Sequence, residues 1–563
     1  KYGTYLSASY QWYSNTTDSN TGGTAIEGAT TNRYTPAATE AGTSYYYCVV
    51  TNTQQGLQES AASDVAVITV KEKEKVEIPL EGSGTEEDPY KITSQADLEA
   101  VANLVKEGYS FEGEYLKMTK SIDMDASWQG IGAINGANAA NGANIRPFSG
   151  TFDGGGFTLN FAEGGKALLS YARKATVRDL NIYAPYMNDY ALLSHYVVDY
   201  GEDGNYGTGT PATINVESVT IKEGSIIKNG GFLGGYASGV NTCTFANCTV
   251  EKNVKIGYNK TTGESSGLSS VGSFAGAING TFISCVSYAD VYGVDNVGGI
   301  CGAKGQSMGP YSVSNSGFYG NIYATGSYVG GIAGTGYGSP SAPNSPCASI
   351  QNCAVAGNIT GLNNVGGIYG GESAIYQNWG AAYIRDNSFC GTLTATGENA
   401  NIGGIVGYMY SLNKYNIFNN NYYCADNVSK PIGAVKYVDT SSTTHEKVSG
   451  AEYINTSVEL PGMTGISKKD HNRTDDPLGA DSDTIGKKVT AEEMADGTVT
   501  DLLNGSESSY KNWTIVNGTP AHSSEPVAYK LTLSGSYQTE FNTGDRLTTD
   551  GMVITASYSD GTT

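Results

Sequence analysis

One hydrophobic phrase recurs along the middle of the chain and sets the pattern of the sequence. It consists of an aliphatic residue, two small residues, a second apolar residue, a variable residue and glycine. The phrase occurs at residues 271–276, 297–302, 329–334, 365–370 and 402–407, and successive starts lie 26, 32, 36 and 37 residues apart. Short fixed phrases joined by connections of variable length are typical of solenoids, in which each repeat adds one coil.

A second phrase, clearest at residues 350–359 (IQNCAVAGNI), lies between these repeats. Its echoes fall at 245–248, 282–285, 313–316 and 384–388. A single repeat is too small to bury its own apolar face, whereas stacked repeats form parallel sheets with strands about 4.8 Å apart and one continuous core. Glycine permits tight corners, and asparagines at equivalent places can form amide ladders. The sequence therefore predicts an all-β fold, a parallel β-helix that is right-handed by the usual crossover rule.

Weaker coils precede and follow the regular repeats, and a helix precedes them all. Candidate coils replace glycine with alanine or serine at 167–171, 175–182, 191–195 and 231–235, and a last coil falls at 417–424 and 432–435. Residues 94–107 predict an amphipathic helix with Ser94 as its N-cap and Leu98, Val101, Leu104 and Val105 on one face. Because an open solenoid end exposes core and strand edges, we expect this helix to act as a cap.

The two ends of the chain differ from the repeats. Residues 1–70 contain short alternating strands with Trp12 and Cys48, and Tyr46 lies two residues before the cysteine as in a tyrosine corner. This segment resembles the Ig-like β-sandwich modules of bacterial surface proteins, with its first strand missing. Residues 71–81 are a charged linker, and residues 527–563 resemble the start of another, truncated bacterial Ig-like domain.

The region that begins at residue 82 resembles a known family. The opening Asp88-Pro-Tyr-Lys-Ile92, the turn Phe152-Asp-Gly154 and the later Gly-Gly-Ile repeats occur in order. Together they are similar to the β-helical GLUG-motif proteins on the surfaces of gut and other Firmicutes. The resemblance covers about residues 82–520 and implies a β-helix domain at 82–522, with a helix and final strand closing it at 488–520. The family carries no shared catalytic motif, so the resemblance implies no catalytic residue.

Composition narrows the classes of partner. The net charge is −22, which argues against nucleic acid and against anionic membrane surfaces, because both require Lys and Arg. No apolar run is long enough to span a bilayer. The chain starts at Lys1 without an initiator Met, so we expect a fragment of a larger protein. The resemblance to surface proteins implies that this protein is secreted or attached to a cell wall, and we expect it to be a monomer.

Neither the cysteines nor the acidic residues predict a metal site. There are nine Cys and no CxxC pair, and Cys248, Cys285 and Cys353 share one place in the repeat, which predicts stacked apolar core residues. Residues 437–487 are polar and acidic and break the repeat pattern. We interpret them as an insertion; calcium binding is the alternative, although their spacing fits no known loop. We expect no cofactor.

The segment from residue 183 to residue 206 is the strongest candidate for a site. Aromatic faces beside carboxylates suit sugar stacking or a protein contact, because tyrosine offers contact area with little loss of entropy. Its tyrosines are Tyr183, Tyr186, Tyr190, Tyr196, Tyr200 and Tyr206. In an enzyme, Asp189, His195 and Asp199 would form the acid–base set. Asp123, Asp125 and Asp153 are further carboxylates, which we interpret as strand-end and turn residues.

Two functional hypotheses follow. The first is a modular adhesin whose β-helix binds host or dietary glycans or glycoproteins, with mucin and immunoglobulin among the candidate ligands. The second is a carbohydrate-active enzyme on the same scaffold: a polysaccharide lyase, a glycoside hydrolase or a fructan transferase. Such an enzyme needs two or three converging carboxylates, or a carboxylate with a base, on one exposed face. We favour the adhesin.

Overall fold

The computed structural model divides the chain into two compact units, residues 1–79 and 80–563. The described residues are 7–36, 41–54, 57–70, 76–134, 145–196, 213–236, 242–304, 311–337, 346–374, 381–409, 417–435, 485–505, 513–522, 528–534 and 553–558. The predicted insertion at 437–487 therefore lies almost wholly outside the described residues, and residues 71–75 of the predicted linker at 71–81 lie outside them as well.

The first unit contains an antiparallel sheet of order β2-β1-β3-β4, in which β5 also pairs with β3. Its strands are β1 (Ser7–Asn15), β2 (Thr24–Ala25), β3 (Gly42–Gln54), β4 (Leu57–Ala62) and β5 (Ala66–Val70). The long β3 pairs with β1 along one side and with β5 and then β4 along the other. Strand β3 thus pairs with three of the other four strands, and β2 joins through β1. The described residues of this unit form a single sheet, and the predicted sandwich is not confirmed.

Aromatic residues order this sheet. The ring of Tyr34 lies 6.0 Å from that of Trp12 and 5.7 Å from that of Tyr46. The hydroxyl that bonds to backbone belongs to Tyr47, which accepts the N–H of Gly23 at 3.0 Å. This contact lies one residue beyond the predicted tyrosine corner at Tyr46. Cys48 is a free, buried thiol.

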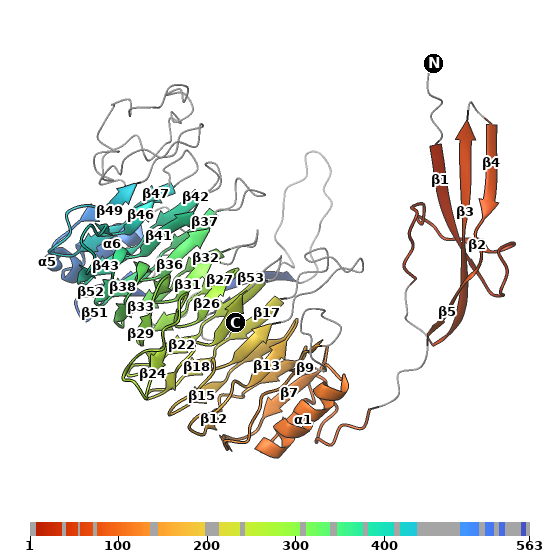
Figure 1. Cartoon of the computed structure of the whole chain (residues 1–563), viewed down its shortest axis with the longest axis horizontal. Coiled ribbons are helices and arrows are strands. Elements are labelled where there is room, and N and C mark those ends of the chain that lie inside the picture. Colours follow the sequence, from red (N-terminus) through yellow and green to blue (C-terminus); the bar gives the residue numbers. More distant parts are fainter. Residues whose placement is uncertain are drawn as a thin grey trace. The chain divides into compact units, whose positions relative to one another are not determined.

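The second unit is a stack of parallel coils, and this confirms the predicted parallel solenoid (Figure 1). Each coil contributes one strand to each of up to five sheets, which we number in chain order. The long connections outside the described residues in the middle of the stack join a strand of sheet 3 to the next strand of sheet 1. Connections of variable length therefore recur at this corner. The right-handed sense of the coil stays a prediction.

The first three sheets run along the whole stack. Sheet 1 contains β6 (Tyr90–Ile92), β7 (Tyr115–Met118), β11 (Thr151–Asp153), β14 (Thr176–Arg178), β17 (Thr213–Glu217), β21 (Thr242–Ala246), β27 (Gly280–Ile283), β32 (Tyr311–Ser314), β37 (Pro346–Gln351), β42 (Ala381–Arg385) and β47 (Ile417–Asn419). Sheet 2 contains β8 (Ile122–Met124), β12 (Thr158–Phe161), β15 (Asn181–Tyr183), β18 (Thr220–Ile221), β22 (Thr249–Val250), β28 (Val286–Ser287), β33 (Gly317–Phe318), β38 (Ala354–Ala356), β43 (Ser388–Cys390), β48 (Tyr422–Cys424) and β50 (Lys487–Lys488). Sheet 3 contains β13 (Leu169–Ala172), β16 (Leu193–Tyr196), β20 (Leu233–Tyr236), β26 (Ala275–Ile278), β31 (Cys301–Lys304), β36 (Ala333–Tyr337), β41 (Tyr369–Ala374), β46 (Val406–Met409) and β49 (Ile432–Val435).

Two shorter parallel sheets complete the coils, and four short antiparallel pairs lie outside them. Sheet 4 contains β19 (Ile226–Ile227), β23 (Lys255–Ile256), β29 (Asp290–Gly293), β34 (Ile322–Ala324), β39 (Ile359–Gly361) and β44 (Leu393–Ala395). Sheet 5 contains β30 (Val297–Gly298), β35 (Ser327–Gly330), β40 (Asn363–Gly366) and β45 (Ile402–Gly403). The pairs are β9 (Ala133–Ile134) with β10 (Ile145–Arg146), β24 (Tyr258–Asn259) with β25 (Glu264–Ser265), β51 (Trp513–Val516) with β52 (Thr519–His522), and β53 (Ala528–Ser534) with β54 (Val553–Tyr558).

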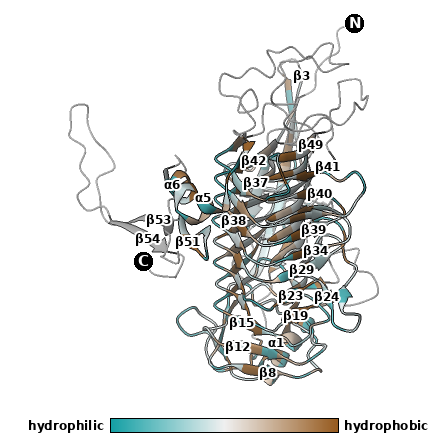
Figure 2. Ribbon diagram, turned by 90° about the vertical axis from the view of Figure 1, so that its left-hand side faces the viewer, coloured by the Kyte–Doolittle hydropathy of each residue, from teal (hydrophilic) through white to brown (hydrophobic). Residues whose placement is uncertain are grey.

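Equivalent apolar residues superpose along the core. In sheet 1, Phe245 pairs with Phe282, and their rings stack at 5.2 Å; Val313 and Ile350 continue the column in the next coils. All four side chains are fully buried. Figure 2 shows brown hydrophobic residues recurring at the same place from coil to coil. The prediction that apolar residues of equivalent phrases point inward and stack is confirmed.

The second glycine of the recurrent phrase is required by close packing. A Cβ on Gly331 would lie 2.2 Å from the carbonyl oxygen of Gly367 and 2.6 Å from the side chain of Val355. The equivalent Gly367 has the same relation to the Gly404 oxygen, at 2.2 Å, and to Phe389, at 2.5 Å. Neighbouring coils approach here without room for any side chain. The phrase therefore marks the turn from sheet 5 to sheet 3, where the backbones of neighbouring coils are in contact.

Asparagine ladders form at the corners, as predicted. Asn352, in the left-handed region at φ 55°, donates from Nδ2 to Oδ1 of Asn315 in the previous coil at 2.7 Å. One place further along, Asn387 donates to Oδ1 of Asn421 at 2.9 Å and accepts the N–H of Cys353 at 2.9 Å. Asparagine suits these corners because it tolerates positive φ and satisfies buried backbone groups.

Helix α1 (Gln95–Glu107) lies at the N-terminal end of the stack, beside β7 (Figure 1). Its N-cap is Ser94, whose side chain accepts the N–H of Asp97 at 3.3 Å, and Gly108 ends it in the left-handed conformation. The helix contacts β8, β9 and β10. Its buried face consists of Leu98, Val101 and Val105, whereas the fourth predicted residue, Leu104, is only half-buried because it lies at the edge of that face.

The C-terminal segment, described at residues 485–505 and 513–522, packs along the side of the stack. Its strand β50 pairs with β48 at the end of sheet 2. Helices α5 (Ala491–Ala495) and α6 (Thr498–Gly505) and the β51–β52 hairpin lie against the outer face of sheet 2, beside β38 (Figure 2). The sequence predicts that residues 488–520 close the end of the coil. The structure instead places most of them over its flank.

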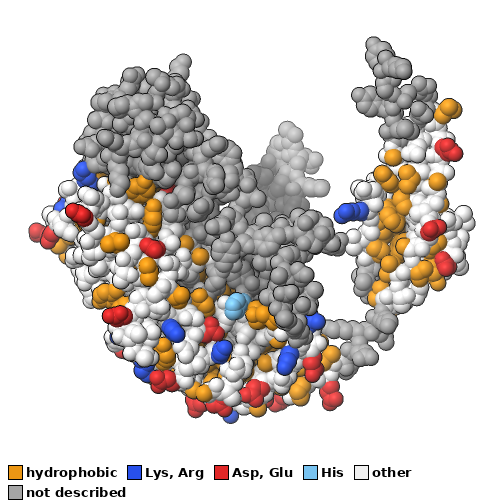
Figure 3. Space-filling view, in the orientation of Figure 1, with side chains coloured by type: hydrophobic (Ala, Val, Ile, Leu, Met, Phe, Trp, Pro, Cys, Tyr) orange, Lys and Arg blue, Asp and Glu red, His pale blue; other side chains and the backbone are white. Residues whose placement is uncertain are grey.

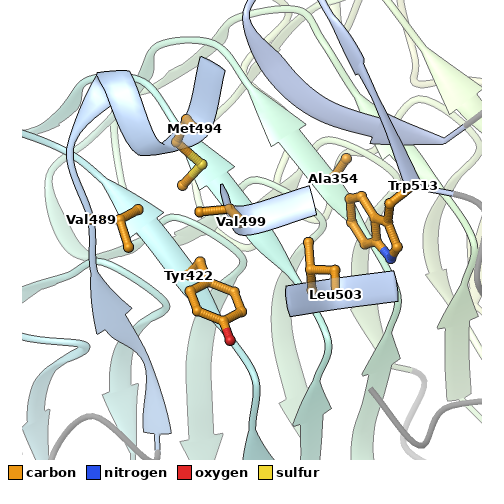
Figure 4. Packing of buried hydrophobic residues seen from close by; sticks show 7 residues of the cluster. All are labelled: Ala354, Tyr422, Val489, Met494, Val499, Leu503 and Trp513. Atoms are coloured by element: carbon orange, nitrogen blue, oxygen red, sulfur yellow. The ribbon is translucent and has the colours of Figure 1, made fainter. Parts of the chain in front are cut away.

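A small apolar core holds the C-terminal segment in place (Figure 4). The segment contributes Val489, Met494, Val499, Leu503 and Trp513, and the stack contributes Ala354 and Tyr422. Because side chains alternate along a strand, Ala354 and Tyr422 point outward while their neighbours Val355 and Tyr423 fill the coil. The indole Nε1 of Trp513 donates to Oδ1 of Asn352 at 2.5 Å.

His522 makes this attachment sensitive to acid. Its Nε2 is shielded from solvent, and its ring lies 4.7 Å from that of Trp513. Burial lowers the pKa of His522 from 6.5 to about 4. Below pH 6.5 the unfolded chain binds a proton that the folded chain takes up only near pH 4. The free energy of unfolding therefore falls as the pH drops through this range, by about 3 kcal/mol from this residue.

The His522→Gln variant, which has no group that titrates here, measures this contribution. We expect the unfolding free energy of the unchanged chain to fall by about 3 kcal/mol more between pH 7 and pH 4 than that of the variant. Denaturant titrations at both pH values, followed by tryptophan fluorescence, give the two differences. Equal pH dependence in the two proteins would contradict the assignment.

Candidate functional site

The predicted tyrosine cluster divides between surface and interior. Tyr183 ends β15 and is 36% exposed, whereas Tyr186 is only 8% exposed and Tyr190 is half-buried. Burial, and secondly the charge of Asp189, raises the pKa of Tyr190. Tyr196 lies in β16, but its side chain is outside the described part of the chain. Tyr200 and Tyr206 are outside the described residues as well.

The predicted acid–base set has a structural role where it is described. Oδ2 of Asp189 accepts the hydroxyl of Ser194 at 2.6 Å and the N–H of Ala167 at 3.4 Å, and its Oδ1 accepts the N–H of Tyr190 at 2.9 Å. The carboxylate thus holds the turn before β16. His195 is exposed and stacks on Tyr171 at 5.0 Å. Asp199 lies outside the described residues.

The other candidate carboxylates hold strands together, as the sequence interpretation has it. Asp153 is buried between Lys117 and Arg178 of the adjacent coils, with N–O distances of 3.5 and 3.3 Å. Asp123 accepts the side-chain amide of the next coil's Asn160 at 2.8 Å. Hydrogen bonds from Ser127, and then from Gln95, lower the pKa of Asp125. None of the three carboxylates is left without a partner.

A row of tyrosines that the sequence analysis missed lies on the outer face of sheet 4. The inward residues of β29 and β34 are Val291 and Ile322, so the alternating residues Tyr292 and Tyr323 point outward. The rings of Tyr292 and Tyr323 stack at 4.9 Å with an angle of 20° between them. The ring of Tyr258 lies 4.9 Å from Tyr292, tilted by 55°. We call Tyr258, Tyr292 and Tyr323 the tyrosine row.

A second stacked pair lies on the neighbouring outer face of sheet 2. Tyr288 stacks on Tyr319 at 5.3 Å and is 45% exposed, whereas the C-terminal segment packs against Tyr319. The signal for both pairs was present in the sequence, because Tyr288 and Tyr319, like Tyr292 and Tyr323, are 31 residues apart. That spacing places each tyrosine at the same point of successive coils.

Two phenols of the tyrosine row, those of Tyr292 and Tyr323, have a raised pKa. Burial, and then the nearby Asp290, raises the pKa of Tyr292 to about 12, and the same two causes raise the pKa of Tyr323. At neutral pH these phenols are therefore hydrogen-bond donors as well as acceptors. The ammonium of Lys255 lies 4.2 Å from the ring centroid of Tyr258, which fits a cation–π contact.

An amide ladder runs beside the tyrosine row. Asn321 donates from Nδ2 to Oδ1 of Asp290 at 2.9 Å, and Asn358 donates to Oδ1 of Asn321 at 3.2 Å. The face therefore combines aromatic rings with polar groups at the spacing of the coils. Figure 3 shows apolar side chains dispersed among polar ones on one face of the coiled body.

Comparison of the chain with protein-family models, with curated proteins and with solved structures finds no match. Within the described residues, no group of three or more His, Cys, Asp or Glu side chains is placed to hold a metal ion. The helices in the same part of the chain include none that is long and apolar enough to cross a membrane. The candidate site is therefore defined by its own geometry, an aromatic and polar surface on a stack of parallel strands.

Proposed function

We propose that this chain is part of a secreted or cell-wall-attached modular adhesin. Its coiled body presents a binding surface for host or dietary glycans or glycoproteins, with mucin and immunoglobulin among the candidate ligands. The chain acts as a monomer. It binds no nucleic acid, because a net charge of −22 repels a phosphate backbone. The sequence resemblance to GLUG-motif surface proteins supports this proposal.

The tyrosine row is the single observation that carries the proposal. Tyr323 is 42% exposed, and the ring of Tyr292 stacks on one of its faces. A rigid aromatic group loses little conformational entropy when it binds, and it offers both an apolar surface and a hydroxyl. Tyr292 and Tyr323 are mounted on the parallel strands β29 and β34 rather than on a loop, which keeps this surface organised before a ligand arrives.

The other elements fit this role as supports. Helix α1 would cap the exposed end of the stack, because it covers apolar residues where no further coil follows. The sheet of residues 7–70 would act as an Ig-like spacer, and the β53–β54 pair would begin a second one. Such an arrangement would hold the binding surface away from a cell wall.

An enzymatic role is not favoured by any specific observation. A general acid or base needs a carboxyl group that can exchange protons with a substrate. Asp189 instead accepts two hydrogen bonds from its own turn and one from Ala167, and Asp153 is paired with two cations. The polysaccharide lyase, glycoside hydrolase and fructan transferase alternatives therefore rest on the scaffold alone.

A combined binding and turnover experiment tests the proposal. The intact chain is applied to an array of neutral and acidic glycans, mucins and immunoglobulins, and each bound ligand is then incubated with the chain and examined by mass spectrometry. We expect retention without any change in ligand mass. Cleaved or rearranged products would instead support the enzyme, and the absence of any binding would overturn the adhesin.

A further inference from the structure

The tyrosine row stops abruptly in the middle of sheet 4. In the next coil the position in register with Tyr323 is Thr360, and in the coil after that it is Thr394. A threonine side chain is too short to cover a phenol ring. The outer face therefore steps down beside Tyr323, and we call the surface over Thr360 and Thr394 the shelf.

The step leaves one aromatic face of the row open. Tyr292 has a ring on either side of it, from Tyr258 and Tyr323, so its faces are already in contact. Tyr323 has a stacked ring only on the side of Tyr292 among the described residues, and it is 42% exposed. Its free face is directed along the stack, over the shelf.

The shelf carries both polar and apolar groups. Asn358 and Thr394 are exposed, and Thr360 is half-buried. Leu362, which is 42% exposed, donates its backbone N–H to the oxygen of Gly326 at 2.7 Å and so lies in the coil next to Tyr323. Hydroxyl and amide groups thus surround an apolar ring face and an apolar side chain.

No charged residue occurs on these three coils of the face. Residues 320–326, 357–363 and 391–397 contain no Asp, Glu, Lys or Arg, although the whole chain has 88 of them (33 basic and 55 acidic). A net charge of −22 also repels anionic ligands from the molecule as a whole. An anionic ligand is therefore disfavoured, and the shelf offers no charged side chain that would pair with a charged ligand of either sign.

We propose that the shelf binds a neutral pyranose unit of a glycan. The apolar face of the sugar ring stacks on Tyr323, in the position that the next aromatic ring of the tyrosine row would occupy. The hydroxyls of the sugar hydrogen-bond to Thr360, Thr394 and Asn358. This inference rests on the proposed function and names its binding site and ligand class. A sugar ring has about the thickness of an aromatic ring, so it occupies one step of about 4.8 Å between strands.

Two variants of the intact chain test the shelf from opposite directions. Tyr323→Ala removes the stacking face, and Thr360→Tyr fills the shelf with an additional ring that continues the row in register. We expect each to weaken binding by tenfold or more, because buried aromatic contacts dominate such interfaces. Thr220→Tyr is the matched control, since Thr220 is a half-buried threonine on the outer face of sheet 2. It should leave binding unchanged.

The probes are cellohexaose and mannohexaose as neutral ligands and hexagalacturonate as an acidic one, alongside the glycan array. Calorimetry gives the affinities, and thermal unfolding checks that every variant is folded. Binding of a neutral glycan that both shelf variants weaken supports the inference. Binding of neutral glycans that neither variant alters, or binding of only acidic glycans or proteins, overturns it and leaves the proposed function standing. Failure of the unchanged chain to bind anything overturns both.

Discussion

Replacing Gly331 with alanine is expected to destabilise the coiled body by about 3 kcal/mol, the upper end of the usual cost of overpacking. The new methyl group would lie 2.2 Å from the backbone oxygen of Gly367 and 2.6 Å from the side chain of Val355. The oxygen belongs to the next coil, so relief requires two coils to separate and their parallel hydrogen bonds to lengthen. Denaturant unfolding followed by circular dichroism measures the loss.

Gly505→Ala provides the control for this substitution. Gly505 ends α6, and a Cβ placed on it would meet no atom within 4 Å. We expect its effect to stay within about 0.5 kcal/mol, as for most surface changes. If Gly331→Ala were as mild as Gly505→Ala, the close approach of the coils at the recurrent phrase would be wrong.

Replacing Trp513 with alanine is expected to cost about 3–5 kcal/mol, the usual range for a buried large aromatic residue. The indole is 5% exposed and lies in the core that joins the C-terminal segment to sheet 2. Its loss also removes the hydrogen bond to Asn352, leaving a buried amide oxygen without its donor. Because solenoid coils contact mainly their neighbours, the loss falls on the C-terminal segment rather than on the whole stack.

Hydrogen exchange measures this local effect. We expect amides of α5, α6 and β51 to lose protection in Trp513→Ala, while amides of β14 and β17 keep theirs. The control is Leu502→Ala, which removes a side chain of the same segment that is 44% exposed. Unchanged protection in α5 and α6 would show that the segment is held by something other than this core.

The C-terminal segment also shapes the surface that is left for binding. It covers the outer face of sheet 2 around Tyr319 and Ala354, but Tyr288 in the preceding coil remains 45% exposed. Sheet 4, next to it along each coil, keeps its outer face with the tyrosine row. The exposed aromatic surface is therefore what remains after one flank of the stack has been covered.

The sequence by itself determined the coil. The repeated phrase at 297–302 and its equivalents required parallel stacking. Val297 and Ile300 both point inward, and both can be buried only when the same phrase of the next coil lies against them. Ser94 and the spacing of Leu98 and Val101 likewise placed α1. These features depend on neighbours along the chain or on the next repeat, so the pattern of residues contains them.

The tertiary structure alone decided which outer faces are covered and which are free. Periodicity identifies the inward side of each strand, but it cannot say whether a distant segment lies on the outward side. Trp513 and Asn352 are 161 residues apart and yet share a hydrogen bond. Likewise, residues 183–206 looked like one site because they are close in sequence, whereas the tyrosine row is assembled from separate coils whose stacking brings their rings within 4.9 Å.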